Sequence, residues 1–157
     1  MFGITACVFR FANVVGGRQT HGVGFDFVRR LLVNPDRLAI MGDGTQSKCC
    51  IHVSDIVAAV LHAARYSPKD FDAYDVATGD YITVTEIAEL AAECLELPVL
   101  PRFDYAGGGR GWKGDVPVVR LNTDRIQGLG WRCRHGSSEA LRISLLALIE
   151  DARAGRI

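Results

Sequence analysis

The apolar residues of this chain form two kinds of run, one typical of strands and one typical of helices. Residues 4–15 (ITACVFRFANVV) are almost continuously apolar, which predicts a strand buried on both faces of a parallel sheet. Shorter runs predict further strands at residues 38–42, 48–53 and 73–78. Over residues 23–32 the apolar positions recur at helical spacing, and Asn34-Pro35 ends this predicted helix.

Capping residues predict three more helices and mark where they begin. Ser54 precedes an apolar face and indicates a helix over residues 54–66. Thr83 and Glu86 have the spacing of a capping box and open a helix that Pro98 ends. Thr123 caps a short helix. The longest helix is predicted over residues 137–154, starting at Ser137 or Ser138, with a buried stripe of Leu141, Leu145, Leu148 and Ile149.

The stretch from residue 101 to 119 differs from the rest, because five glycines lie between residues 107 and 114. This composition predicts a loop. Elsewhere strands and helices alternate along the chain, so the predicted fold class is α/β. The strands are too few for a complete doubly wound sheet.

Composition and charge narrow the class of protein. The chain has 157 residues, of which 48% are hydrophobic and 23% charged, enough for one domain with a core. Its 18 basic and 18 acidic residues cancel and form no long run of one sign, so we expect no nucleic-acid or membrane partner. No apolar run approaches the roughly 20 residues of a membrane span. Arg10 interrupts the first apolar run, so we expect no signal peptide.

The five cysteines point to reduced, mostly buried thiols in a cytoplasmic protein. Their odd number, one adjacent pair and the lack of a C-x-x-C spacing argue against a disulfide framework and against a metal site. The five are Cys7, Cys49, Cys50, Cys94 and Cys133.

Three glycine clusters are candidate phosphate cradles, namely NVVGGR, MGDGTQ and GGGRGWKGD. None is the G-x-G-x-x-G turn between a first strand and a helix, and none is a Walker loop. No Tyr is followed four residues later by Lys, and no nucleophile elbow occurs. The residues therefore indicate anion contacts without a catalytic group. Asn13 lies at the end of a predicted parallel strand, where it either contacts a ligand or bonds local backbone.

A family resemblance rests on four segments in order: RFANVVGGRQTHGVGFDFV, LAIMGDGTQSKCCIHVSDIVAAV, YDVATGDYITVTEIAELAAE and GWKGDVPVVRLNTDRIQGLGW. Together they resemble the C-terminal half of the NAD-dependent epimerase/dehydratase family, extended short-chain dehydrogenases of the UDP-glucose 4-epimerase kind. The resemblance covers nearly the whole chain. It implies a partial Rossmann-type parallel sheet with a small mixed α/β substrate lobe. Residues 1–15 and 54–78 would be remnants of the NAD domain, and residues 16–53 and 79–157 the substrate-binding lobe.

The resemblance also implies roles for individual residues. The implied contacts to a nucleoside-diphosphate sugar are Asn13, Gly22, Val23 and Lys48 near the diphosphate, Ala39, Ile40 and Met41 along the base, Arg110 at the phosphates and Asp115 at the ribose. Phe11 and Ala12 would lie along the nicotinamide of NAD. Trp112 stands where many members have a phosphate-binding Arg, and Arg110 or Lys113 would replace it. Lys48 could equally be a solvated cation.

The resemblance implies the sugar-nucleotide-binding portion of an NAD-dependent epimerase or dehydratase. The expected partners are an N-terminal NAD-binding half that is missing here and a second copy in a homodimer. Because the family's Tyr and Lys are absent, we expect the isolated chain to be inactive and to bind no NAD alone. Two alternatives remain open: a stand-alone nucleotide-sugar binding module, and a dimerising interaction fragment without a ligand.

Overall fold

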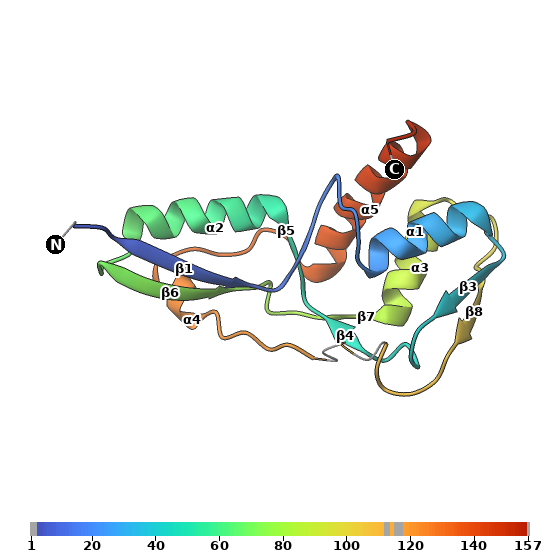
Figure 1. Ribbon diagram of the computed structural model, residues 1–157, viewed down its shortest axis with the longest axis horizontal. Helices are drawn as coiled ribbons and strands as arrows, with labels where there is room; N and C mark the ends of the chain where they lie inside the picture. Colours follow the sequence, from blue (N-terminus) through green and yellow to red (C-terminus); the bar gives the residue numbers. More distant parts are fainter. Residues whose placement is uncertain (1–2, 112–113, 115–117, 157) are drawn as a thin grey trace.

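The computed structural model describes residues 3–111, 114 and 118–156. Figure 1 shows an elongated molecule with a strand pair and helices at each end. The helices are α1 (Val23–Val33), α2 (Val53–Tyr66), α3 (Val84–Cys94), α4 (Asp124–Gly128) and α5 (Ser137–Arg153). The strands are β1 (Ala6–Phe11), β2 (Asn13–Val15), β3 (Arg37–Ile40), β4 (Ser47–Lys48), β5 (Cys50–His52), β6 (Phe71–Val76), β7 (Ile82–Thr83) and β8 (Arg102–Tyr105). The pairs β1–β6, β2–β5 and β3–β8 are parallel, whereas β4–β7 is antiparallel.

One end of the molecule is the β1–β6 pair with α2 and α4. Its hydrophobic cluster joins residues of β5, α2 and β6 with Ile126 of α4 and with Trp131. Arg125 of α4 pairs with the buried carboxylate of Asp72 and also donates a 2.8 Å hydrogen bond to the carbonyl of Ala73. The segment around α4 is thereby held against β6.

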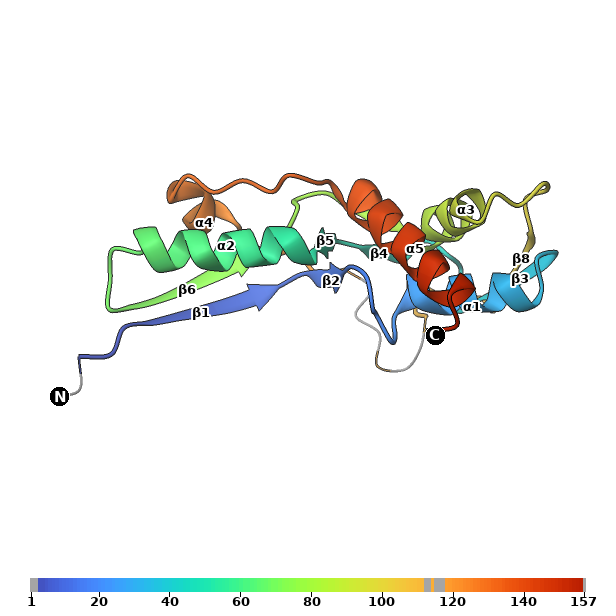
Figure 2. The same cartoon turned by 90° about the horizontal axis from the view of Figure 1, so that it is seen from above.

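The prediction that the first strand is buried on both faces is wrong. Val8 is 47% exposed and Phe11 is 41% exposed. Within the described chain β1 is hydrogen-bonded only to β6, and it forms the outer border of this end in Figure 2. A strand needs neighbours on both edges and layers on both faces to be fully buried. The described part of the chain therefore leaves exposed some apolar residues of β1 that the sequence pattern predicted to be buried.

The predicted single strand over residues 4–15 is also divided, because the chain changes partner after Ala12. The backbone N–H of Ala12 bonds to Val76 of β6, at 3.1 Å, whereas that of Asn13 bonds to the carbonyl of Cys49, also at 3.1 Å. β2 then continues beside β5. Asn13 thus lies where the chain passes from one strand pair to the next, the kind of position at which open α/β sheets bind ligands.

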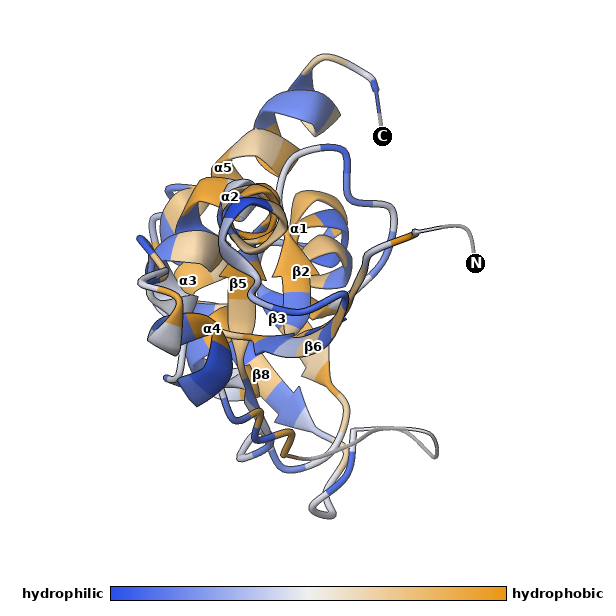
Figure 3. Cartoon of the chain, turned by 90° about the vertical axis from the view of Figure 1, so that its left-hand side faces the viewer, coloured by the Kyte–Doolittle hydropathy of each residue, from blue (hydrophilic) through white to orange (hydrophobic). Residues whose placement is uncertain are grey.

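The other end of the molecule is formed by α1, α3 and α5, which pack on one another, and by the β3–β8 pair, whose strand β3 contacts α1 and α3 (Figure 1). Its core holds the predicted residues Leu141, Leu145 and Ile149 of α5, while Leu148 is likewise fully buried. In Figure 3, β2 appears among the hydrophobic parts of the chain, and its last residue, Val15, belongs to this core. α5 therefore bridges the strands near the middle of the molecule and the helical end.

The segment 102–105, predicted as a loop, is a strand. Its four residues pair in parallel register with β3, from Arg37 opposite Arg102 to Ile40 opposite Tyr105. Arg37 also pairs with Asp104. The glycines that suggested a loop begin only at Gly107, after the strand has ended. The pairing joins residues far apart in the chain, so the local composition did not reveal it.

Most predicted elements lie within two residues of the observed ones, but some ends differ. The predicted strand 48–53 is split between β4 and β5, and α2 begins at Val53. The N-cap of α2 is His52 rather than Ser54, because the His52 ring nitrogen accepts the N–H of Ser54 at 3.3 Å. Thr123 is the N-cap of α4 but makes no side-chain capping bond.

The capping box predicted for α3 is confirmed. The N–H of Glu86 bonds to Thr83 Oγ1 at 3.2 Å, and Glu86 Oε2 accepts the N–H of Thr83 at 2.7 Å. These bonds from the backbone and hydroxyl of Thr83 lower the pKa of Glu86. The Thr83 hydroxyl and the Glu86 carboxylate each accept a backbone N–H at the start of α3, and the negative charge of Glu86 is favourable at this end of a helix. The capping box therefore stabilises the folded state.

Replacing Thr83 with Ala should lower the free energy of unfolding by about 1 kcal/mol. The substitution leaves the N–H of Glu86 without its side-chain acceptor. The control is Ser138→Ala, which removes an exposed hydroxyl from the first turn of α5 and should change stability little. Urea unfolding followed by circular dichroism measures both. Equal effects of the two substitutions would contradict the assigned role of the capping box.

Candidate binding site

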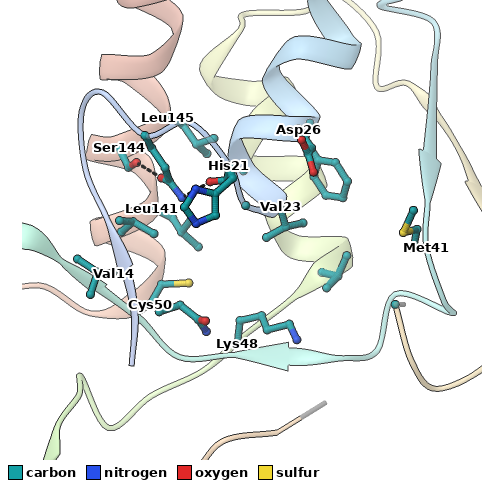
Figure 4. Close-up of a pocket in the computed structure, with 18 of the residues that line it drawn as sticks. Val14, His21, Val23, Asp26, Met41, Lys48, Cys50, Leu141, Ser144 and Leu145 are labelled. Atoms are coloured by element: carbon teal, nitrogen blue, oxygen red, sulfur yellow. Dashed lines mark hydrogen bonds between the residues drawn. The ribbon is translucent and has the colours of Figure 1, made fainter. Parts of the chain in front are cut away.

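A cavity of about 510 Å³ lies where α1, α5, β2 and β4 approach one another. Figure 4 shows Lys48 on the side of β4, Val23 at the start of α1, and Ser144 and Leu145 on α5. Its walls include apolar side chains of β2, α1 and α5 and polar groups from several segments. Such a mixture is typical of a small-molecule site.

The glycine turn after β2 is anchored on α5. The N–H of Gly16 donates to Ser144 Oγ at 3.0 Å, and the same hydroxyl lies 3.0 Å from the carbonyl of Gly16. A side chain at this position would come within 2.9 Å of Val53. The N–H of Arg18 is directed to the carboxylate of Asp151 at 3.3 Å. Glycine at position 16 therefore allows the backbone to pack closely against Val53, and its N–H is already hydrogen-bonded to Ser144.

The start of α1 forms a second wall of the cavity. Gly22 is the N-cap, with φ of 108°, and no side chain caps this helix end. Gly24, one residue inside the helix, faces α5, where an added Cβ would lie 3.2 Å from Leu145. The first backbone N–H groups of a helix attract anions. Lys48 lines the same cavity and adds a positive charge.

Asn13 lines the cavity and also bonds local backbone. Its Nδ2 donates to the carbonyl of Cys49 at 3.1 Å. The residue is nevertheless exposed and belongs to the cavity lining. The bond to Cys49 fixes the amide at the point where β2 begins, and a fixed amide is suited to positioning a ligand.

Cys49 and Cys50 have structural contacts. Cys49 Sγ lies 3.1 Å from Thr78 Oγ1, and the backbone N–H of Cys50 donates to Ser137 Oγ at 3.0 Å. Ser137 is in turn held by the carboxylate of Asp80, at 3.0 Å from its N–H and 2.8 Å from its hydroxyl. Burial, and then the neighbouring Cys49, raise the pKa of the Cys50 thiol to about 12. Cys50 lines the cavity as a protonated thiol and is a poor nucleophile.

The structure brings five of the predicted site residues to one cavity. They are Asn13, Gly22, Val23, Met41 and Lys48. The other predicted residues are not part of the lining that the structure describes. Phe11 and Ala12 lie at the end of β1, Ala39 and Ile40 lie in β3, and Arg110 is exposed beside Gly111, which does line the cavity. Asp115, Trp112 and Lys113 fall outside the described residues.

Sequence reasoning missed several polar residues of the cavity. Arg30 and Asp26 come from α1, His21 and Gln19 from the turn before it, and Ser144 from α5. Asp26 and Arg30 are four residues apart and so share one face of the helix. This spacing was visible in the sequence, but only the packing of α1 showed that the shared face borders a cavity.

Comparisons with known proteins agree with this architecture. Residues 1–77 match the model of the NAD dependent epimerase/dehydratase family. The GDP-mannose 3,5-epimerase of Arabidopsis thaliana is 27% identical over 158 residues, covering 96% of this chain and 39% of the relative. A crystal structure of UDP-galactose 4-epimerase superposes with a TM-score of 0.81 and 32% identity, covering 96% of this chain and 48% of that one. The UDP-glucose 4-epimerase of Thermotoga maritima, solved with UDP-glucose, superposes with a TM-score of 0.78 and 26% identity, at the same coverage.

The fold is therefore α/β and corresponds to part of a Rossmann-type epimerase fold. The chain is related to the NAD-dependent epimerase/dehydratase family, as its motifs predicted. It spans less than half the length of these relatives. Among the residues described, no helix is long and apolar enough to cross a membrane, and no cluster of His, Cys, Asp and Glu could hold a metal ion.

The two strongly perturbed thiols predict how stability depends on pH. The pKa of Cys133, like that of Cys50, is raised to about 12, mainly by burial and then by its bond to Asp55. An unfolded thiol titrates near 8.5. Between about pH 8.5 and 12 the unfolded chain releases protons that the folded chain retains, so stability should fall with increasing pH by at most about 1.4 kcal/mol per pH unit for each thiol.

Urea unfolding between pH 8 and 10 measures this slope. The double variant Cys50→Ala/Cys133→Ala should lose stability less steeply than the parent protein, although its stability at pH 7 will be lower. Equal slopes in the parent and the variant would show that these thiols do not govern the alkaline response.

Proposed function

We propose that this chain is the part of an NAD-dependent epimerase or dehydratase that binds a nucleoside-diphosphate sugar. The observation that carries the proposal is the meeting of Asn13, Lys48 and the start of α1 at one cavity. These groups come from three separate elements and are all suited to a diphosphate. In this assignment the cavity near Lys48 holds the diphosphate.

The physical basis is complementary charge and fixed geometry. The uncapped start of α1 offers backbone N–H groups to the phosphate oxygens, and the ammonium of Lys48 approaches from the opposite wall. Asn13 is positioned by its bond to Cys49 and can orient the same group. The apolar side chains Val14, Leu141 and Leu145 reduce the access of water and strengthen these interactions. The binding of UDP-glucose by the Thermotoga maritima relative supports this class of ligand.

The chain offers NAD only part of a site. In this proposal the exposed ring of Phe11 and the neighbouring Ala12, at the end of β1, lie along one face of the nicotinamide. The 157 residues contain no glycine-rich turn between a first strand and a helix to hold the pyrophosphate. When bound, NAD would supply the hydride transfer at a sugar carbon. The residues of this chain would hold the diphosphate so that the sugar reaches the cofactor.

A second polypeptide segment would complete the site. Three apolar side chains of α2 recur at four-residue intervals and are at least 44% exposed, namely Val53, Val57 and Leu61. Among the described residues β1 is also paired along one edge only, so this end of the molecule carries several uncovered apolar groups. The chain also matches less than half of its relatives' length. We infer that an NAD-binding half covers this surface. A second copy of the chain is the alternative occupant.

Calorimetric titration of the chain with UDP, UDP-glucose and NAD tests the proposal. UDP and UDP-glucose should bind, whereas NAD should not bind to this chain alone, and no turnover of UDP-glucose should occur. Light scattering over a range of concentrations reports whether the chain associates with itself. Absence of binding by UDP-sugars and GDP-sugars alike would refute the proposed function.

Replacing Lys48 with Ala should weaken the binding of a nucleoside diphosphate by roughly tenfold or more, because it removes a charge-assisted contact. The matched control is Lys69→Ala, which removes a lysine outside the cavity lining and should leave affinity unchanged. If both variants bind as the parent protein does, Lys48 does not contact the phosphates.

A further inference from the structure

Asp26 is a carboxylate in the wall of a cavity that otherwise suits an anion. It lies in the first turn of α1, is exposed, and lines the cavity together with Met41 of the segment that follows β3. Within the described part of the chain, no hydrogen bond or ion pair engages this carboxylate. Figure 4 shows Asp26 on the side of Met41, away from Ser144 and Val14.

The position of Asp26 relative to β3 is fixed by Arg30. Arg30, one turn further along α1, donates from Nη1 to the carbonyl of Ala39 at 2.9 Å. This bond ties α1 to the strand that ends beside Met41. The guanidinium is thereby directed at the backbone of β3. Asp26 lies on the same side of the cavity as Met41, and the family resemblance implies that Met41 lies along the base of the nucleotide.

Charge decides what a carboxylate can bind here. Next to a diphosphate it is repulsive, unless it faces a group that donates hydrogen bonds. Guanine presents two adjacent donors, N1–H and the 2-amino group, which match the two oxygens of a carboxylate. Uracil presents a single N–H between two carbonyl oxygens, and these oxygens would approach the negative charge. A carboxylate at the base therefore favours guanine over uracil.

We propose that Asp26 recognises the base and that the sugar nucleotide bound by this chain is guanosine-based. The inference rests on the proposed function, because it concerns the same cavity. The relatives leave the base open, since they include a GDP-mannose 3,5-epimerase and UDP-sugar epimerases. Asp26 thus acts as a specificity residue, while Lys48 and the start of α1 hold the diphosphate common to both classes.

Titrations of the chain with GDP, IDP and UDP test the role of Asp26. IDP lacks the 2-amino group, so it offers one donor where GDP offers two. The parent protein should bind GDP about tenfold or more tightly than IDP or UDP. Asp26→Asn should abolish this preference, because an amide supplies one acceptor and one donor in place of two acceptors. The control Glu89→Gln, an exposed carboxylate on α3 outside the cavity, should retain the preference.

The outcomes separate the two proposals. Equal affinities for GDP and UDP that both depend on Lys48 would overturn the role of Asp26 and leave the proposed function standing. An effect of Asp26→Asn on GDP-mannose and UDP-glucose, but not on GDP, would assign Asp26 to sugar hydroxyls and also overturn the inference. Failure of every nucleotide to bind would overturn both proposals. Circular dichroism of each variant checks that the fold is intact.

Discussion

Two buried serine hydroxyls on α5 fix the arrangement on which the rest of the structure depends. Ser137 accepts the N–H of Cys50, and Ser144 accepts the N–H of Gly16. One bond holds α5 to the start of β5, and the other holds it to the turn that follows β2. Buried backbone groups need such partners, because leaving one unsatisfied costs about 1–3 kcal/mol. The wall of the cavity formed by Leu141, Ser144 and Leu145 exists because both bonds position this helix.

The same arrangement explains why two strand pairs with different partners meet at Asn13. β1 pairs with β6 and contacts α2, whereas β2 pairs with β5 and both contact α5. The change of partner leaves a residue with a polar side chain at the junction, beside the cavity. Asp80 reinforces the junction by holding Ser137. Burial would raise the pKa of this carboxyl group, but hydrogen bonds from Thr78 and Ser137 outweigh that effect and lower it. The negative charge of Asp80 also suits the start of α5.

The candidate site was partly predictable for a clear reason. Asn13 and Lys48 could be identified because each lies in a short segment that resembles the epimerase/dehydratase family, at a strand that the apolar pattern predicts. Arg30 and Asp26 could not, because they are charged residues on the exposed side of an ordinary amphipathic helix, where such residues are common. Ser144 likewise resembles any polar residue of a long helix until Gly16 is known to contact it. For β1 the sequence was misleading, because its nearly continuous apolar residues are typical of a buried strand. Only the arrangement of the neighbouring elements shows that β1 is exposed.

The sequence by itself determined the local features of this protein. It specified the capping box of α3, the extent of α1, the buried stripe of α5 and the motifs of the epimerase/dehydratase family, because each depends on residues close together in the chain. The tertiary structure decided the division between β1 and β2, the pairing of β8 with β3 and the membership of the cavity. Those features arise from contacts such as Gly16 with Ser144, which are 128 residues apart. Periodicity reports which face of an element is apolar, but it does not report which distant element that face will meet.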